Sequence, residues 1–238
     1  MIALPSIAFG GFSGSAKGVT ARYQDGRSIL SLKCYPTGEA TILQLARRTS
    51  LKKITKTWPT LTNEQILAWN KAALSADAKS ILGTKGKISG LNLFQRLNFW
   101  VVKLGGSILT TPPTLSGVET PSEATIVCTS AAFTFKLNQA ITDNGGIYLI
   151  IQASEGQSNG VSRGYGKATQ IKAVEEPTDA AIDIKADYEA AKSVLSAGAT
   201  KVFFKYFYVD SATGETSVPM QTMVKWAQTE ADPDPEEP

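Results

Sequence analysis

The hydrophobic periodicity of this chain changes at two adjacent prolines, Pro112 and Pro113. Before them, apolar residues recur at intervals of three and four, which is the spacing of one face of an α-helix. After them, apolar residues alternate over short stretches bounded by turn residues, as in half-buried β-strands. The sequence therefore predicts an α+β protein in which a helical domain precedes a β-sandwich. Residues 110–114 have no bulky apolar side chain and are expected to form a stiff, extended linker.

The segment before the linker is predicted to contain three short helices. The first covers about 39–57, with its apolar positions at Ile42, Leu45, Ala46, Thr49 and Ile54. Trp58-Pro59 ends this helix, because the residue before a proline is pushed out of the α region. The second helix begins at a capping box, Thr62 with Gln65, in which side chain and backbone satisfy each other's hydrogen bonds. The third runs from about 91 to 104, and Gly105-Gly106 suits its end.

Residues 1–36 are predicted to form an extended arm. Two short alternating runs flank Asp25-Gly26, and Asp-Gly between such runs is typical of a tight hairpin turn. An isolated hairpin is only marginally stable in water. We therefore expect the arm to dock on its own domain or on a neighbour.

The segment after the linker is predicted to be an antiparallel β-sandwich of immunoglobulin or fibronectin type. Six or seven short strands with turn residues between them suit this class, and a short helix interrupts them near 187–195. One strand has aromatic residues on both faces, which predicts burial on both sides. These aromatics are Phe203, Phe204, Tyr206, Phe207 and Tyr208.

Four parts follow from these patterns. They are the arm (1–36), a basic helical domain (37–109), the β-sandwich domain (110–227) and an acidic tail (228–238). The tail is rich in proline and acidic residues, and is expected to be disordered alone or ordered only by a basic partner.

Charge is divided between the two halves of the chain. Residues 1–111 contain 15 Lys and Arg against 4 Asp and Glu, a net charge of +11. Residues 112–238 contain 9 against 17, a net charge of −8. Such a bipolar chain can associate head to tail, or place one end on a surface of opposite sign.

Enzymatic activity is not expected, mainly because the chain contains no histidine. Histidine is the most frequent general base and metal ligand, and without it the Ser-His-Asp and Cys-His mechanisms are impossible. The two cysteines, Cys34 and Cys128, are expected to be separate small apolar residues. We predict no catalytic residues, no metal site and no cofactor. We also expect no membrane span and no export signal.

Two groups of residues are candidates for binding. The first is a basic surface that would contact an acidic protein, with nucleic acid and a merely solvated helix face as alternatives. Its residues are Arg22, Arg27, Lys33, Arg47, Arg48, Lys52, Lys53 and Lys56. The second is the polar, glycine-rich loop Gly156–Gly166, which is either a ligand loop or a flexible connection. Its candidate residues are Gln157, Asn159, Arg163 and Tyr165.

One combination of residues resembles a motif of uncharacterised phage and prophage virion structural proteins. It comprises Gln44 and Arg47, then Trp58-Pro59 through Gln65 to Trp69, then Gly90-Leu-Asn-Leu-Phe94 and Asn98. The Gly-rich arm at Gly10–Gly14, and an aromatic strand before the turn Thr213-Gly214, add to the likeness.

The resemblance implies a non-enzymatic virion protein. It would be a capsid decoration or cement protein, or a minor head or tail component, assembled in the host cytoplasm. Its partners would be other virion proteins and further copies of itself. A carbohydrate-binding or cell-surface-binding module, and a nucleic-acid-binding protein, are the alternative functions.

Overall fold

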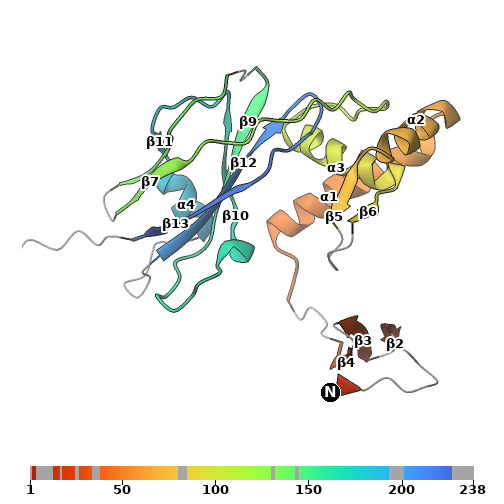
Figure 1. The fold of residues 1–238 in the computed structure, drawn as a ribbon, viewed down its shortest axis with the longest axis horizontal. Helices are drawn as coiled ribbons and strands as arrows, with labels where there is room; N and C mark the ends of the chain where they lie inside the picture. Colours follow the sequence, from red (N-terminus) through yellow and green to blue (C-terminus); the bar gives the residue numbers. More distant parts are fainter. Residues whose placement is uncertain are drawn as a thin grey trace, which may run out of the picture. The chain divides into compact units, whose positions relative to one another are not determined.

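In the computed structural model the chain forms two compact units, Met1–Arg47 and Arg48–Pro238 (Figure 1). Each unit is described by itself. The residues that the structure describes are 2–3, 13–16, 18–24, 27–33, 38–79, 85–129, 132–142, 145–192 and 201–226. Cys34 and the acidic tail lie outside these residues.

The first unit contains a four-stranded antiparallel sheet, which we call the arm sheet. Its strands follow the order β1-β4-β3-β2. They are β1 (Ile2–Ala3), β2 (Gly14–Ala16), β3 (Val19–Gln24) and β4 (Arg27–Leu32). The pairing of β3 with β4, in which Gln24 faces Arg27, confirms the predicted strands of the hairpin. The predicted turn, Asp25-Gly26, lies outside the described residues.

The helices lie close to their predicted positions. α1 covers Ile42–Thr57 and is followed by a short 3-10 turn, η1 (Trp58–Thr60). α2 covers Asn63–Ala73 and begins with the predicted capping box: Gln65 N–H donates to Thr62 Oγ1, and Thr62 N–H donates to Gln65 Oε1. α3 covers Gly90–Lys103, and Gly105 after it has a positive φ of 92°. A small hairpin, β5 (Asp77–Lys79) with β6 (Lys85–Lys87), lies between α2 and α3.

A small apolar core joins the helices. Trp69 and Phe94 are fully buried, and their rings meet edge to face with centroids 5.2 Å apart. The segment that follows α3 is hydrogen-bonded to side chains of these helices. Asn98 Oδ1 accepts a hydrogen bond from Leu109 N–H at 2.6 Å, and Trp69 Nε1 donates to Thr110 O at 2.9 Å. Thr110, the first residue of the predicted linker, is therefore part of the helical packing.

The burial of α1 differs from the sequence prediction. Ile54 is its only buried residue, whereas Ile42 and Leu45, expected on the same apolar stripe, are 85% and 52% exposed. A helix buries residues only where another element covers it. In this unit the contacts of α1 come from its last turns, where Thr55 Oγ1 accepts a hydrogen bond from Gln95 of α3.

Two antiparallel sheets follow the helices and pack face to face as a β-sandwich. One has the order β11-β8-β7 and the other the order β10-β9-β12-β13. The strands of the first are β7 (Ala124–Cys128), β8 (Phe133–Leu137) and β11 (Ile182–Asp183). Those of the second are β9 (Ile147–Ala153), β10 (Thr169–Glu175), β12 (Lys201–Asp210) and β13 (Met220–Lys225). A 3-10 turn, η2 (Tyr165–Lys167), precedes β10, and the helix α4 (Lys185–Lys192) follows β11.

Aromatic side chains join the two sheets. Phe133 and Phe135 of β8 meet Phe204 and Tyr206 of β12, with ring centroids 5.7 Å and 5.1 Å apart. All four rings are buried. Tyr188 of α4 closes one end of the same core against Phe133, and its hydroxyl donates to Ser154 O.

The outer face of the larger sheet packs against α3, which confirms that β12 is buried on both sides. Phe207 of β12 meets Trp100 of α3 edge to face, with centroids 5.5 Å apart. Ile150, Val209, Leu104 and Tyr148 complete this smaller cluster. The turn after β12 also touches the helix: a Cβ built on Gly214 would stand 2.1 Å from Leu97 O. The helices of this unit and the sandwich are therefore joined by packing as well as by the chain (Figure 1).

Candidate interaction surfaces

The basic surface predicted on α1 is present as an exposed row of cations. Arg48, Lys52 and Lys56 recur every four residues, which places them along one face of the helix. Lys53 lies beside them, and all four side chains are exposed. The sequence of α1 contains no acidic residue to neutralise them. We call these four residues the basic stripe. Arg47, also predicted for this surface, is exposed and directly precedes Arg48 in α1.

The predicted basic residues of the arm belong to the other compact unit. Arg22 is exposed on β3, and Lys33 follows β4, where its N–H donates to Gly18 O at 2.8 Å. The side chain of Arg27 lies outside the described residues. A single basic surface made of arm and helix together therefore remains a prediction.

The arm sheet has an apolar face that the sequence analysis did not identify. Directly paired residues of antiparallel strands share a face, and Val19 pairs with Leu32 while Tyr23 pairs with Ser28. Val19, Tyr23 and Leu32 therefore lie on one face, and they are 42%, 43% and 81% exposed. Arg22 points to the opposite face. The alternation of Val19, Ala21 and Tyr23 along the sequence is the pattern from which this apolar face could have been predicted.

The arm sheet has no apolar core of its own among the described residues. The residues classed as buried apolar begin at Ile54, and Ser28 is the one buried residue of the described arm. Sheets become stable by covering one face, and a face of exposed apolar side chains is typical of an interaction site. The first turns of α1 add a similar exposed group, Ile42, Leu43 and Leu45.

The glycine-rich loop is folded against the sandwich. Tyr165 packs edge to face on Phe203 with centroids 5.0 Å apart, and a Cβ on Gly164 would lie 2.2 Å from the Phe203 ring. Gln157 forms a β-bridge with Lys201, whose Nζ donates to Asn159 O at 2.7 Å. Of the predicted ligand residues, Gln157 and Tyr165 therefore serve the packing of the loop, while the side chains of Asn159 and Arg163 are exposed.

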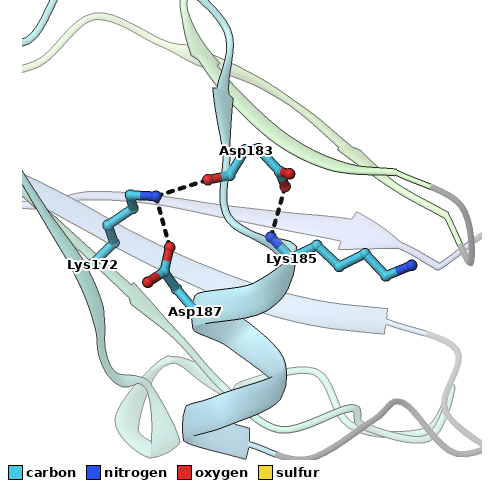
Figure 2. Close-up of polar contacts among 4 residues, drawn as sticks. All are labelled: Lys172, Asp183, Lys185 and Asp187. Atoms are coloured by element: carbon cyan, nitrogen blue, oxygen red, sulfur yellow. Dashed lines mark hydrogen bonds and ion pairs between the residues drawn. The ribbon is translucent and has the colours of Figure 1, made fainter.

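The acidic residues around the start of α4 have structural partners (Figure 2). Asp183 Oδ1 accepts from Lys185 N–H at 2.9 Å, as a capping residue does. Asp187 pairs with Lys172 at 2.6 Å, and Lys172 also donates to Asp183 O. Across the described residues, no three His, Cys, Asp or Glu side chains gather in a way that could hold a metal ion.

Cys128 is buried in the sandwich core, where it is 3% exposed. Burial raises the pKa of its thiol from 9.0 to about 12. Because the thiolate is the reactive form, this cysteine is protected from alkylation and disulfide exchange. Burial also raises the pKa of Tyr208, to about 12.

These pKa shifts predict an alkaline loss of stability. Both groups bind their protons more tightly in the folded chain, so their contribution is complete below pH 9 and is lost as pH rises toward 12. Urea unfolding at about pH 8 and about pH 10.5 should show a lower free energy of unfolding at the higher pH. In Cys128→Ala the decline should be shallower. An equal decline in that variant would contradict the role of the thiol.

Among the described residues, no helix is both long enough and apolar enough to cross a bilayer. No protein-family model matches the sequence, and no characterised protein matches it. A solved structure described as a Fn3-like protein from Clostridium thermocellum matches 49% of this chain and 99% of its own. Its sequence identity is 14% and its TM-score 0.29, a likeness too low to carry an argument about fold or function.

Proposed function

We propose that this chain is a non-enzymatic virion structural protein of a bacteriophage that acts through protein–protein contacts. It would be a capsid decoration or cement protein, or a minor head or tail component, assembled in the host cytoplasm. The observation that carries the assembly role is the arm sheet, whose exposed face bears Val19, Tyr23 and Leu32 while its described residues form no apolar core. The resemblance of the helical motif to phage virion proteins supports the proposal that this assembly is a phage virion.

The arm sheet is expected to bind a partner because its apolar face is less favourable in water than when it is covered. Burying apolar surface contributes about 25 cal/mol per Å², so covering three large side chains would stabilise a complex by several kcal/mol. A neighbouring virion protein would cover the face that bears Val19, Tyr23 and Leu32. The basic stripe adds attraction to an acidic surface, which increases the rate and specificity of docking.

We assign the sandwich to the immunoglobulin or fibronectin type. In the proposed virion protein it would serve as a rigid module. In order along the chain, its first, second and fifth strands form one sheet, and the fourth, third, sixth and seventh form the other. This two-sheet antiparallel arrangement, with both inner faces filled by aromatic and aliphatic side chains, is the arrangement of that class.

The test is incorporation into particles. The chain should be found by mass spectrometry in purified virions of a phage that encodes it, and Val19→Ser with Tyr23→Ser and Leu32→Ser should reduce its amount at least tenfold. The matched control is Val127→Ser with Val218→Ser and Met223→Ser, which changes residues of the sandwich that are 45%, 64% and 42% exposed. Wild-type protein that is abundant in infected cells and absent from virions would overturn the proposal.

A further inference from the structure

A row of polar side chains crosses the outer face of the larger sheet. Lys205 of β12 is two residues before Phe207, so both side chains point to this face. Lys205 pairs with Gln152 of β9 and with Gln221 of β13. Gln152 in turn pairs with Gln170 of β10. Directly paired residues share a face, so the four side chains form one row about 14 Å long at about 4.8 Å between strands. We call it the polar row.

Most of the hydrogen-bonding capacity of the polar row is unused. Gln170 accepts a hydrogen bond from Lys103 of α3, which confirms that the row faces the side of this helix. The side chains of Gln152, Lys205 and Gln221 form no hydrogen bond or ion pair with another residue of the described chain. Gln152 and Lys205 are half-buried, and Gln221 is exposed. Each amide can donate and accept at once, so the row offers both functions to a ligand.

This end of the outer face is basic, although residues 112–238 have a net charge of −8. The segments that build it contain no Asp or Glu; they are residues 147–154, 156–170, 201–209 and 220–225. They hold five of the nine Lys and Arg of residues 112–238, and we call these five the basic face: Arg163, Lys167, Lys201, Lys205 and Lys225. α3 adds two cations and no acidic residue.

The basic residues surround the polar row on one side of the sheet. Lys201 and Lys225 are directly paired, two strand positions beyond Phe203 and Met223. Arg163 and Lys167 are exposed and flank Tyr165 in sequence, and Tyr165 packs on Phe203 from the outer side. Like charges in a direct cross-strand pair destabilise a sheet. An anion bound beside Lys201 and Lys225 would remove that cost.

The acidic residues nearest in sequence lie elsewhere. A hydrogen bond with Glu175 raises the pKa of Tyr148, which places this carboxylate at the other end of the face, beyond the residues that α3 covers. Burial, and to a smaller extent Cys128 and Glu155, raise the pKa of Tyr188. Glu155 therefore lies close to α4 and the inner core.

The chemistry of this surface distinguishes between kinds of polyanion. Single-stranded nucleic acid is held by bases stacked on open aromatic rings, whereas Phe203 and Phe207 are only 1% and 7% exposed. A protein partner would need an apolar centre, and Met223 is the one large apolar side chain that β13 exposes. Sugar hydroxyls donate and accept hydrogen bonds as amides do, and sugar carboxylates pair with Lys and Arg.

We propose that the polar row and the basic face together bind an acidic polysaccharide. The sugar hydroxyls contact Gln152 and Gln221, and the sugar carboxylates lie against Lys205, Lys225 and Lys167. A row that crosses four strands suits an extended chain of sugars. This inference goes beyond the proposed assembly role, because it gives the sandwich a ligand of its own.

Titration calorimetry of the full chain with polygalacturonate, a polymer of an acidic sugar, tests the proposal. Binding should be measurable at about 50 mM salt and much weaker at about 500 mM, where charges are screened. Polyglutamate offers carboxylates without hydroxyls and should bind about tenfold more weakly. No binding of polygalacturonate, or equal binding of polyglutamate or a single-stranded oligonucleotide, would overturn the proposal.

Charge reversal locates the site. Lys167→Glu with Lys205→Glu and Lys225→Glu should abolish binding of polygalacturonate. The matched control, Arg48→Glu with Lys52→Glu and Lys56→Glu, reverses the same number of charges on the basic stripe of α1 and should bind as wild type. If the control loses affinity as the first variant does, net charge and not the basic face is responsible, and the proposal fails.

Amide removal tests the polar row without changing the charge. Gln152→Ala with Gln221→Ala should weaken binding about tenfold, as expected for the loss of two hydrogen bonds. Gln221 is exposed, so Gln221→Ala alone keeps the test valid if the double variant is destabilised. Gln139→Ala, an exposed amide after β8, is the control and should bind as wild type. Unchanged affinity in both variants of the row would contradict its role.

The outcomes separate this inference from the proposed function. Chains that enter virions but do not bind polygalacturonate would overturn the polysaccharide site and leave the virion role intact. Chains that bind polygalacturonate through the basic face but are absent from virions would overturn the virion role alone.

Discussion

Gly214→Ala should lower the free energy of unfolding by more than about 3 kcal/mol. Gly214 has a φ of +73°, which costs a residue with a Cβ about 1 kcal/mol. The larger effect is steric, because the new Cβ would stand 2.1 Å from Leu97 O and 2.7 Å from Leu97 C. These are backbone atoms of α3 and cannot rotate away, so either the turn or the helix must move.

Gly117→Ala is the matched control for this experiment. Gly117 has a similar φ of +81°, but a Cβ there would meet no atom within 4 Å. Its substitution should cost only about 1 kcal/mol. Urea unfolding followed by circular dichroism gives both values. Equal losses in the two variants would show that the turn after β12 is not pressed against α3.

Trp69→Ala should cost about 3–5 kcal/mol, the usual range for removing a large buried aromatic side chain. Trp69 is fully buried against Phe94, and its Nε1 donates to Thr110 O. The substitution removes the ring and leaves that carbonyl without its partner, so the segment after α3 should loosen as well. Hydrogen exchange at residues 106–111 should therefore become faster.

Leu67→Ala is the control for Trp69→Ala. Leu67 lies on the same helix but is 67% exposed, so its loss should change the free energy of unfolding by less than about 0.5 kcal/mol. A small effect of Trp69→Ala, close to that of Leu67→Ala, would contradict the assignment of Trp69 to the core of the helices.

Much of the fold could be predicted because local signals agreed with tertiary packing. The capping box at Thr62 and Gln65 depends only on residues three apart, and it is present as predicted. The aromatic residues on both faces of β12 predicted two buried sides, and the structure has a core on each.

The failures came where burial depends on a distant element. Periodicity placed Ile42 and Leu45 on a buried stripe, but no element of the described chain covers them. Leu43, beside them at the start of α1, is also exposed, at 74%. The hydrogen bonds of Leu109 with Asn98 and of Thr110 with Trp69 could not be predicted either. Composition alone predicts a linker and says nothing of its hydrogen bonds.

The candidate surfaces were predicted in part. The basic stripe follows from the sequence, since cations four apart on a helix must share a face. The loop residues Gln157 and Tyr165 could not be judged from the sequence, because their packing partners, Lys201 and Phe203, lie more than thirty residues away.

The position of α3 between two apolar cores has a mechanical consequence. Phe94 and Leu97 of this helix belong to the core of the helices, while Trp100 and Leu104 belong to the cluster on the outer face of the larger sheet. A force that pulls the sandwich away from α1 is therefore carried by packed side chains before it reaches the backbone around Pro112 and Pro113. Because close-packed interiors deform little, the helical part of this unit and the sandwich should move together as one rigid body.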